Sequence, residues 1–231
     1  MFGAFAEQVC IGTGGLTPIP DGIDDHTAAA SGVAFRTAYH ALRSTARVAA
    51  GDDIVVLGAG GGVGLAAVAL GAALGARVVA VASSAEKLSA AARYGANRGI
   101  EHGGDLRQAL REALPGGATA VIDPVGGELS EPALRSLKRG GRFVTVGFAS
   151  GSIPRIPLNL VLVKGVQVMG FQFQDIAAEE FTRNESELRA LLASRAVAPH
   201  IGATYALAET ASALRHVADG RAIGKVIIDV R

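Results

Sequence analysis

The sequence predicts an α/β protein built on a parallel sheet with helices on both faces. From residue 54 onward, short runs of β-branched and aliphatic residues alternate regularly with helix-like segments. The first run, residues 54–57, enters a turn with five glycines between Gly58 and Gly64. A segment rich in Ala, Leu and Val then continues to Gly75 without proline or interior charge. This order of strand, turn and helix is typical of a doubly wound, Rossmann-type dinucleotide-binding sheet.

The glycine turn fits two spacings, Gly58-x-x-Gly61-x-x-Gly64 and Gly58-x-x-x-Gly62-x-Gly64. Glycine suits such a turn because the backbone must adopt unusual angles and let a ligand approach closely. The helix that follows would offer unpaired N–H groups and a positive dipole end to a phosphate. A short-chain dehydrogenase would use the second spacing, but the Tyr-x-x-x-Lys pair of that class is missing. We therefore prefer the first spacing.

The composition is that of a core-rich globular protein, with 231 residues of which 49% are hydrophobic and 19% charged. A net charge near +1 without a run of Lys or Arg predicts no nucleic-acid partner. Cys10 is the only cysteine, which excludes an internal disulfide and predicts a small buried side chain. The longest apolar run, residues 65–74, is too short to span a bilayer, and no N-terminal signal is evident. We expect a cytoplasmic protein without a membrane partner.

Before the glycine turn, residues 1–20 are predicted to be β-rich, and residues 24–30 to form a short helix with acidic residues at its start. A second helix is predicted over residues 34–48. After the turn, strands are expected at 77–82, 98–102, 118–123 and 142–147, with helices between them that include 106–114 and one ending at Leu137. Ser83 and Glu86 have the spacing of a capping box at the start of the helix after the second strand. A loop at 149–157, a strand at 166–171, helices at 177–194 and 208–218, and a last strand at 225–230 complete the prediction.

Several blocks, in order along the chain, resemble the zinc-independent quinone oxidoreductases of the medium-chain dehydrogenase/reductase superfamily. The blocks are 3–7, 37–42, 58–64, 83–88, 123–127, 147–151, 153–159 and 224–226. The resemblance covers almost the entire chain and implies an NADPH-binding Rossmann domain at 31–198. Residues 1–30 and 199–231 would be the remnant of an incomplete, β-rich GroES-like catalytic domain. Family members carry a further segment of domain size before residue 3, so we expect this chain to be a member shortened at its start.

The end of the second strand favours NADPH over NADH. An acidic residue usually binds the ribose 2′-hydroxyl of NAD at this position. Here the sequence reads Ala82-Ser83-Ser84, with no carboxylate until Glu86 and with Lys87 one turn further on. Hydroxyl groups and an ammonium group suit a 2′-phosphate. A helix cap is the alternative role for Ser83, and both roles are compatible.

The resemblance implies the other cofactor contacts. The loop around Val63 would hold the pyrophosphate, and Thr37 would lie near the nicotinamide. His102 would lie near the adenosine phosphate, although a surface histidine at a strand end is an equal alternative. The expected cofactor-binding residues are Thr37, Gly60, Gly61, Gly62, Val63, Ser83, Lys87, His102, Gly126, Gly127, Gly147, Phe148 and Phe171. Both phenylalanines have a simpler alternative role as core residues.

No zinc site is predicted. In zinc-dependent relatives a cysteine ligand falls four residues before the threonine that matches Thr37, and here Val33 occupies that position. The histidines at 26, 40, 200 and 216 form no ligand spacing. No general base is evident either, so the catalytic residues stay unassigned. Hydride transfer depends mainly on the cofactor and on positioning, so a missing acid–base pair does not argue against it.

These observations predict an NADPH-dependent oxidoreductase that transfers hydride from the nicotinamide to a quinone or an activated alkene without zinc. A 2-enoyl thioester reductase is the alternative within this class. Because the front of the catalytic domain is absent, a catalytically idle NADPH-binding or structural protein is the alternative from another class. The expected partners are a small-molecule substrate and a second copy of the chain. The strand at 166–171 resembles the family's edge strand, which pairs across a two-fold axis.

Overall fold

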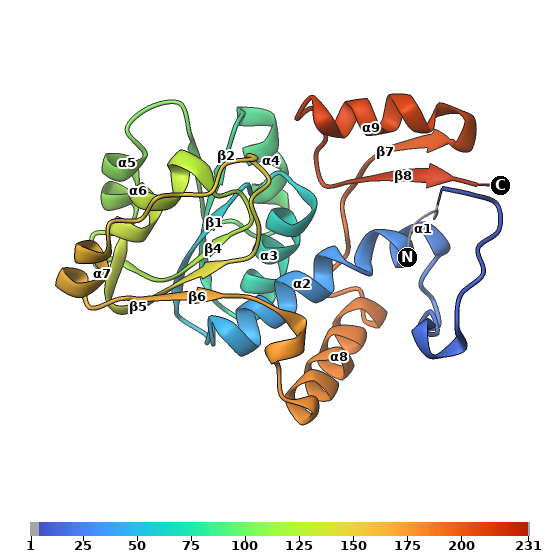
Figure 1. The fold of residues 1–231 in the computed structure, drawn as a ribbon, viewed down its shortest axis with the longest axis horizontal. Helices are drawn as coiled ribbons and strands as arrows, with labels where there is room; N and C mark the ends of the chain where they lie inside the picture. The colour runs from blue at the N-terminus through green and yellow to red at the C-terminus, as the bar shows by residue number, and fades with distance from the viewer. Residues whose placement is uncertain (1–4, 231) are drawn as a thin grey trace.

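The computed structural model describes residues 5–230 and centres on a six-stranded parallel sheet in the order β3-β2-β1-β4-β5-β6 (Figure 1). The strands are β1 (Asp53–Leu57), β2 (Arg77–Ala82), β3 (Arg98–Glu101), β4 (Ala118–Asp123), β5 (Leu137–Thr145) and β6 (Gln167–Gly170). The chain order reverses between β1 and β4. In open α/β sheets, ligands bind beyond the carboxyl ends of the strands at such a reversal. The predicted doubly wound, Rossmann-type sheet is confirmed.

Helices cover both faces of this sheet, because successive strand side chains point to opposite faces. Ile54 and Val56 of β1 face one hydrophobic core, whereas Val55 and Leu57 face the other. The helices α2 (Ala34–His40), α3 (Gly62–Ala73), α4 (Ala85–Arg93) and α8 (Ala178–Ala193) contribute to the first core. The second core is covered by α5 (Leu106–Ala113), α6 (Ser130–Arg135) and α7 (Leu158–Lys164). Burial on both faces explains why the central strands are continuous apolar runs.

The last residues form a separate two-stranded parallel sheet of β7 (Ile201–Ala206) and β8 (Lys225–Asp229), joined by α9 (Thr210–Ala218). The helix α1 (Asp25–Ser31) lies beside β8, so residues from both ends of the chain meet at the upper right of Figure 1. His26 Nε2 lies 3.5 Å from Asp229 Oδ2 in this contact. The assignment of 1–30 and 199–231 to a GroES-like remnant stays a prediction.

The prediction of a β-rich N-terminus was wrong for its described part. Residues 5–24 contain a 3₁₀ turn, Thr13–Gly15, and no strand, while residues 1–4 lie outside the described residues. Alternation alone does not make a strand, because a strand also needs a hydrogen-bonding partner. The segment 17–20 instead lies against α1 and α8, where it lines a small apolar pocket. Cys10 is exposed, which corrects the expectation of a buried side chain.

Two further boundaries differ from the predictions, and one strand was not predicted. The helix from Ala34 ends at His40 and continues as a wide π-helical turn, Ala41–Thr45. β5 begins at Leu137 rather than at residue 142, because its start pairs with Ala118 through an irregular register. The strand β7 was not predicted, since Gly202 interrupts its short alternating pattern. No helix in residues 5–230 is both long and apolar enough to cross a membrane.

Candidate functional site

The glycine turn joins β1 to α3 at the reversal of strand order. Gly58 has φ +61°, and its carbonyl oxygen accepts a hydrogen bond from Gly61 N at 2.9 Å. A Cβ atom on Gly64 would lie 2.0 Å from that same oxygen, so the first turn of α3 packs directly on the backbone. Glycine is therefore required at both positions. No side chain caps the N-terminus of α3 at Gly61, which leaves the N–H groups of its first turn available to an anion.

Two lysines lie over this turn. A Cβ atom on Gly60 would lie 2.5 Å from Lys87 Cγ, and one on Gly62 would lie 2.8 Å from Lys225 Cδ. Lys87 Nζ donates to Ser83 Oγ at 2.9 Å, at the carboxyl end of β2. The predicted residues Gly60, Gly62, Ser83 and Lys87 are thus brought together. The stem of Lys87 therefore packs on Gly60, and the ammonium group of Lys225 lies 3.8 Å from the position of a Cβ atom on Gly62 at the start of α3.

The predicted capping box at the start of α4 is replaced by a cap from the next residue. Ser84 is the N-cap, and its side-chain oxygen accepts from Lys87 N at 3.3 Å. Ser83 is exposed and does not cap the helix. Because Ser84 has the capping role, the hydroxyl group of Ser83, which accepts from Lys87 Nζ, can still donate to a ligand.

The residues before β8 pass over the glycine turn, a contact that the motif analysis missed. Gly224 N donates to Gly60 O at 2.8 Å, and Lys87 Nζ donates to Gly220 O at 2.7 Å. Gly224 has φ +66°, and a Cβ atom there would lie 2.3 Å from His200 O. The sequence signal for this contact was the pair Gly224-Lys225 directly before an apolar strand. A glycine at this position lets the chain pass close to the glycine turn, so that the lysine after it lies over the turn.

A second turn follows β4 beside the glycine turn. Asp123 is fully buried; its Oδ1 accepts from Val125 N at 2.9 Å and Gly126 N at 2.8 Å, and its Oδ2 accepts from Ser130 Oγ at 2.6 Å. All of these bonds stabilise the turn, so this carboxylate has a structural role. A Cβ atom on Gly58 would lie 2.6 Å from Val125 Cγ2, which shows how closely the two turns pack.

The loop after β5 is held against this second turn. Gly127 N donates to Ser152 O at 3.0 Å, and Ser150 N donates to Val125 O at 3.0 Å. A Cβ atom on Gly126 would lie 2.9 Å from Phe148 Cδ1, so the exposed phenylalanine ring rests on a glycine. The predicted residues Gly126, Gly127, Gly147 and Phe148 therefore form one cluster at the carboxyl edge of β4 and β5.

The remaining predicted residues lie at three places. Thr37 is half-buried on α2, which packs against α3. His102 follows β3, and its backbone N–H donates to Ala82 O at 3.0 Å, so it lies beside the end of β2. The ring of Phe171 is buried in the core, with its centroid 5.0 Å from that of Phe173. Phe171 can therefore offer a ligand its backbone only.

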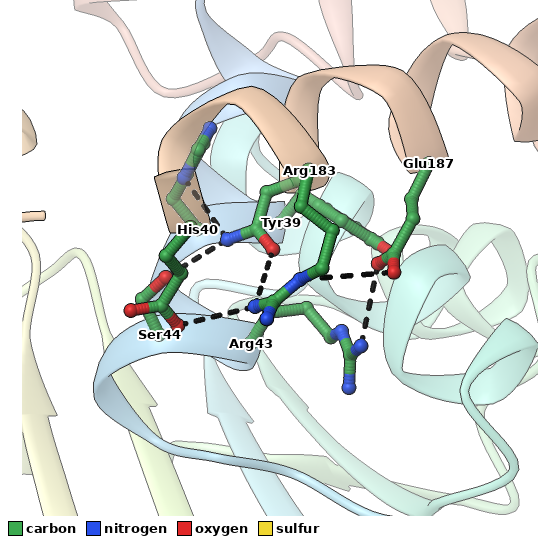
Figure 2. Close-up of polar contacts among 8 residues, drawn as sticks. Tyr39, His40, Arg43, Ser44, Arg183 and Glu187 are labelled. Carbon is green, nitrogen blue, oxygen red and sulfur yellow. Dashed lines mark hydrogen bonds and ion pairs between the residues drawn. The ribbon is translucent and has the colours of Figure 1, made fainter. Parts of the chain in front are cut away.

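Polar side chains join α2 to α8 (Figure 2). The buried His40 stacks on Phe181, with ring centroids 4.8 Å apart, and its Nε2 lies 2.9 Å from Glu185 Oε1. Arg36 Nε donates to the same carboxylate oxygen at 2.9 Å, which gives this arginine a structural role. Because α2 is held through several buried contacts, Thr37 has a defined position beside α3.

A second contact between α2 and α8 is formed by Tyr39, whose hydroxyl donates to Glu187 Oε2 at 2.7 Å (Figure 2). Burial, together with this carboxylate, raises the pKa of Tyr39 to about 12. The same hydrogen bond lowers the pKa of Glu187, with the Arg43 guanidinium as a further cause. The pair is therefore a phenol and a carboxylate anion at neutral pH. Within residues 5–230, no group of three or more His, Cys, Asp or Glu side chains is placed to hold a metal ion.

The fold and the two turns define a Rossmann-type α/β protein with a candidate ligand site at the reversal of strand order. The profile of the family described as "Zinc-binding dehydrogenase" matches residues 62–191. The bovine (Bos taurus) "Quinone oxidoreductase-like protein 2" is 34% identical over 236 residues, which covers 100% of this chain and 68% of that protein. The chain therefore belongs to the quinone oxidoreductase family of the medium-chain dehydrogenase/reductase superfamily.

Solved structures agree with this assignment. The quinone oxidoreductase of Thermus thermophilus, whose structures include a complex with NADPH, is 32% identical with a TM-score of 0.85, covering 99% of this chain and 74% of that one. The Escherichia coli quinone oxidoreductase complexed with NADPH is 28% identical with a TM-score of 0.83, covering 92% and 68%. The chain thus spans about two thirds to three quarters of these relatives.

Proposed function

We propose that this chain is an NADPH-dependent oxidoreductase that reduces a quinone or an activated alkene without zinc. The observation that carries the proposal is the contact of Lys87 with both Gly60 and Ser83. It joins a cationic side chain, an exposed hydroxyl group and the free N-terminus of α3 in one place. The NADPH complexes of the Thermus and E. coli relatives support the choice of cofactor.

The residues present fit this cofactor. Gly58 and Gly64 form a turn without side chains, which would admit the pyrophosphate to the N–H groups of α3. Ser83 and Lys87 would hold the 2′-phosphate, because an ammonium group and a hydroxyl group both donate to phosphate oxygens. Lys225 would add positive charge at the pyrophosphate. The cluster of Gly126, Gly127 and Phe148 would contact the nicotinamide end.

When bound, NADPH would supply the hydride, and the protein would orient the reacting groups. Thr37 would contact the nicotinamide end from α2, since the contacts of His40 and Arg36 with Glu185 hold that helix on α8. Zinc independence is supported by Val33, whose side chain cannot ligate a metal at the position that a cysteine occupies in zinc-dependent relatives.

Replacement of Lys87 by Gln is expected to weaken NADPH binding about 10-fold, because a charge-assisted hydrogen bond is worth roughly 1.5–3 kcal/mol. NADH lacks the 2′-phosphate, so its binding should change little. Titration of cofactor fluorescence measures both constants. Arg93→Gln is the matched control, since it removes one exposed positive charge from the same helix, α4. An equal loss of affinity for NADH and NADPH would contradict the assignment of Lys87 to the 2′-phosphate.

Turnover is tested by NADPH oxidation with a panel of quinones and enoyl thioesters. Oxidation with quinones supports the proposed activity, and oxidation with enoyl thioesters alone supports the 2-enoyl thioester reductase. Saturable NADPH binding without turnover would support the catalytically idle protein instead.

We further propose a homodimer that forms through β6. Within the described chain, β6 pairs with β5 on one side and is an edge strand on the other. Val168 on this strand is 47% exposed, and Leu158 and Leu162 of the neighbouring α7 are 79% and 81% exposed. An open edge strand beside exposed leucines favours pairing with another chain.

Light scattering should therefore give the mass of a dimer for the natural chain. Leu162→Glu should give a monomer, because dimer formation would have to bury the new charge on the exposed face of α7. Leu214→Glu is the control, since Leu214 is a half-exposed leucine on the distant α9. A monomer mass for the natural chain would contradict the homodimer.

A further inference from the structure

A groove lies between α5, α6 and α7, near the amino-terminal ends of β4 and β5. This is the opposite end of the sheet from the glycine turn, and the two are separated by the length of β4, roughly 20 Å for six residues. Its volume is about 700 Å³, within the range of small-molecule sites. The groove is therefore a different place from the proposed cofactor site.

Six positively charged side chains from four elements line this groove, and no acidic side chain is among its lining residues. They are Arg107 and Arg111 of α5, Arg135 of α6, Lys138 and Arg139 of β5, and Lys164 of α7. In the described chain, one of the six forms an ion pair, Arg135 with Glu131 at 2.7 Å. The whole protein carries a net charge of only +1, so positive charge is concentrated here. Such a concave site of one sign attracts anions.

Two glycines lie close to two of these residues. Gly117 has φ +78°, and a Cβ atom there would lie 2.8 Å from Lys138 N. Gly165 has φ +59°, and a Cβ atom there would lie 3.1 Å from Arg139 Cζ. The positive φ angles favour glycine at both positions, and at Gly117 the backbone of Lys138 leaves no room for a side chain. The floor of the groove contains the buried side chains of Leu114 and Leu137, so the cations stand around a packed surface.

We propose that this groove binds a small anion with two or more linked phosphate groups. Guanidinium groups bind phosphate through paired hydrogen bonds, and Arg107 and Arg111 lie one helical turn apart on the same face of α5. The groove volume of about 700 Å³ and its cations on four elements favour an anion larger than a single phosphate. A nucleic acid or a lipid surface would need an extended basic face, whereas these six cations line one groove.

Isothermal titration calorimetry with inorganic tripolyphosphate at low salt tests the proposal. The natural chain should bind the anion, and Arg107→Gln/Arg111→Gln should weaken binding at least tenfold. Arg93→Gln/Arg98→Gln removes the same charge from exposed positions on α4 and β3 and should change it little. Lys87→Gln/Lys225→Gln alters the glycine-turn site and should leave groove binding intact. ATP in place of tripolyphosphate tests whether a nucleoside adds affinity.

Three results would overturn the proposal. One is the absence of tripolyphosphate binding to the natural chain. Another is equal weakening by the α5 pair and the control pair, which would mean unspecific attraction. The third is loss of binding in the Lys87/Lys225 variant alone, which would place the anion at the glycine turn. Vesicles containing phosphatidylglycerol provide the last comparison: groove-dependent vesicle binding without tripolyphosphate binding would identify a lipid surface instead.

Discussion

Gly64→Ala is expected to destabilise the fold and to abolish NADPH binding. The new Cβ atom would lie 2.0 Å from Gly58 O and 2.6 Å from Gly58 C, both of which are backbone atoms that no rotamer change can move aside. Helix α3 would have to shift away from β1, which disturbs the packing of Leu65 and Val68 in the first core. Overpacking of this kind costs on the order of 3 kcal/mol. For a chain of this size the melting temperature should fall by roughly 6–12 °C.

Gly61→Ala is the matched control for this prediction. At Gly61 the φ angle is −86°, and the nearest atom to an added Cβ atom would be 3.4 Å away. The variant should keep the melting temperature of the natural chain, although the methyl group would reduce the space for a phosphate at the turn. Thermal unfolding and NADPH titration on both variants separate the two effects. If Gly64→Ala has the same melting temperature as the natural chain, α3 does not pack on the backbone of Gly58 as closely as described.

The sheet was predictable because its signals are local. The strands β1, β2 and β4 are short, mainly apolar runs, and each is followed by a helix, so their alternation is visible without any contact information. The N-terminal segment lacks such a signal. Apolar and polar residues alternate in part of the segment 5–24, but the structure that this segment adopts depends on the surface that it contacts, here α1 and α8. β7 was missed because Gly202 interrupts its short alternating pattern.

The candidate site was predictable where the backbone conformation requires glycine. Gly58, Gly64 and Gly126 hold positions that a side chain cannot occupy, so the spacing of the glycines in the sequence indicates where the backbone turns tightly. Lys225 was missed as a neighbour of the glycine turn because it is far from that turn in sequence. The basic groove was missed for a related reason: its cations are scattered from residue 107 to residue 164, and only the fold gathers them.

The turn after β4 depends on Asp123, and Asp123→Ala is expected to cost on the order of 4 kcal/mol. The carboxylate is fully buried and accepts hydrogen bonds from Val125 N, Gly126 N and Ser130 Oγ. Removal would leave these donors without a partner, and each buried unsatisfied group costs about 1–3 kcal/mol. NADPH binding should weaken as well, because Gly126 and the loop bearing Phe148 would lose their support. Denaturant unfolding measures the loss of stability, and cofactor titration measures the loss of NADPH affinity.

Two comparisons show whether the hydrogen bonds themselves carry this effect. Asp123→Asn keeps an oxygen acceptor and the size of the side chain, so it should cost clearly less than alanine. Asp105→Ala removes an exposed carboxylate that accepts one backbone bond, from Gln108 N at 3.0 Å, and should cost about 1 kcal/mol as an ordinary helix cap. Equal losses for Asp123→Ala and Asp105→Ala would mean that the buried carboxylate contributes no more than a surface cap. The turn at Gly126 would then be held by the backbone bonds of residues 148–152 rather than by Asp123.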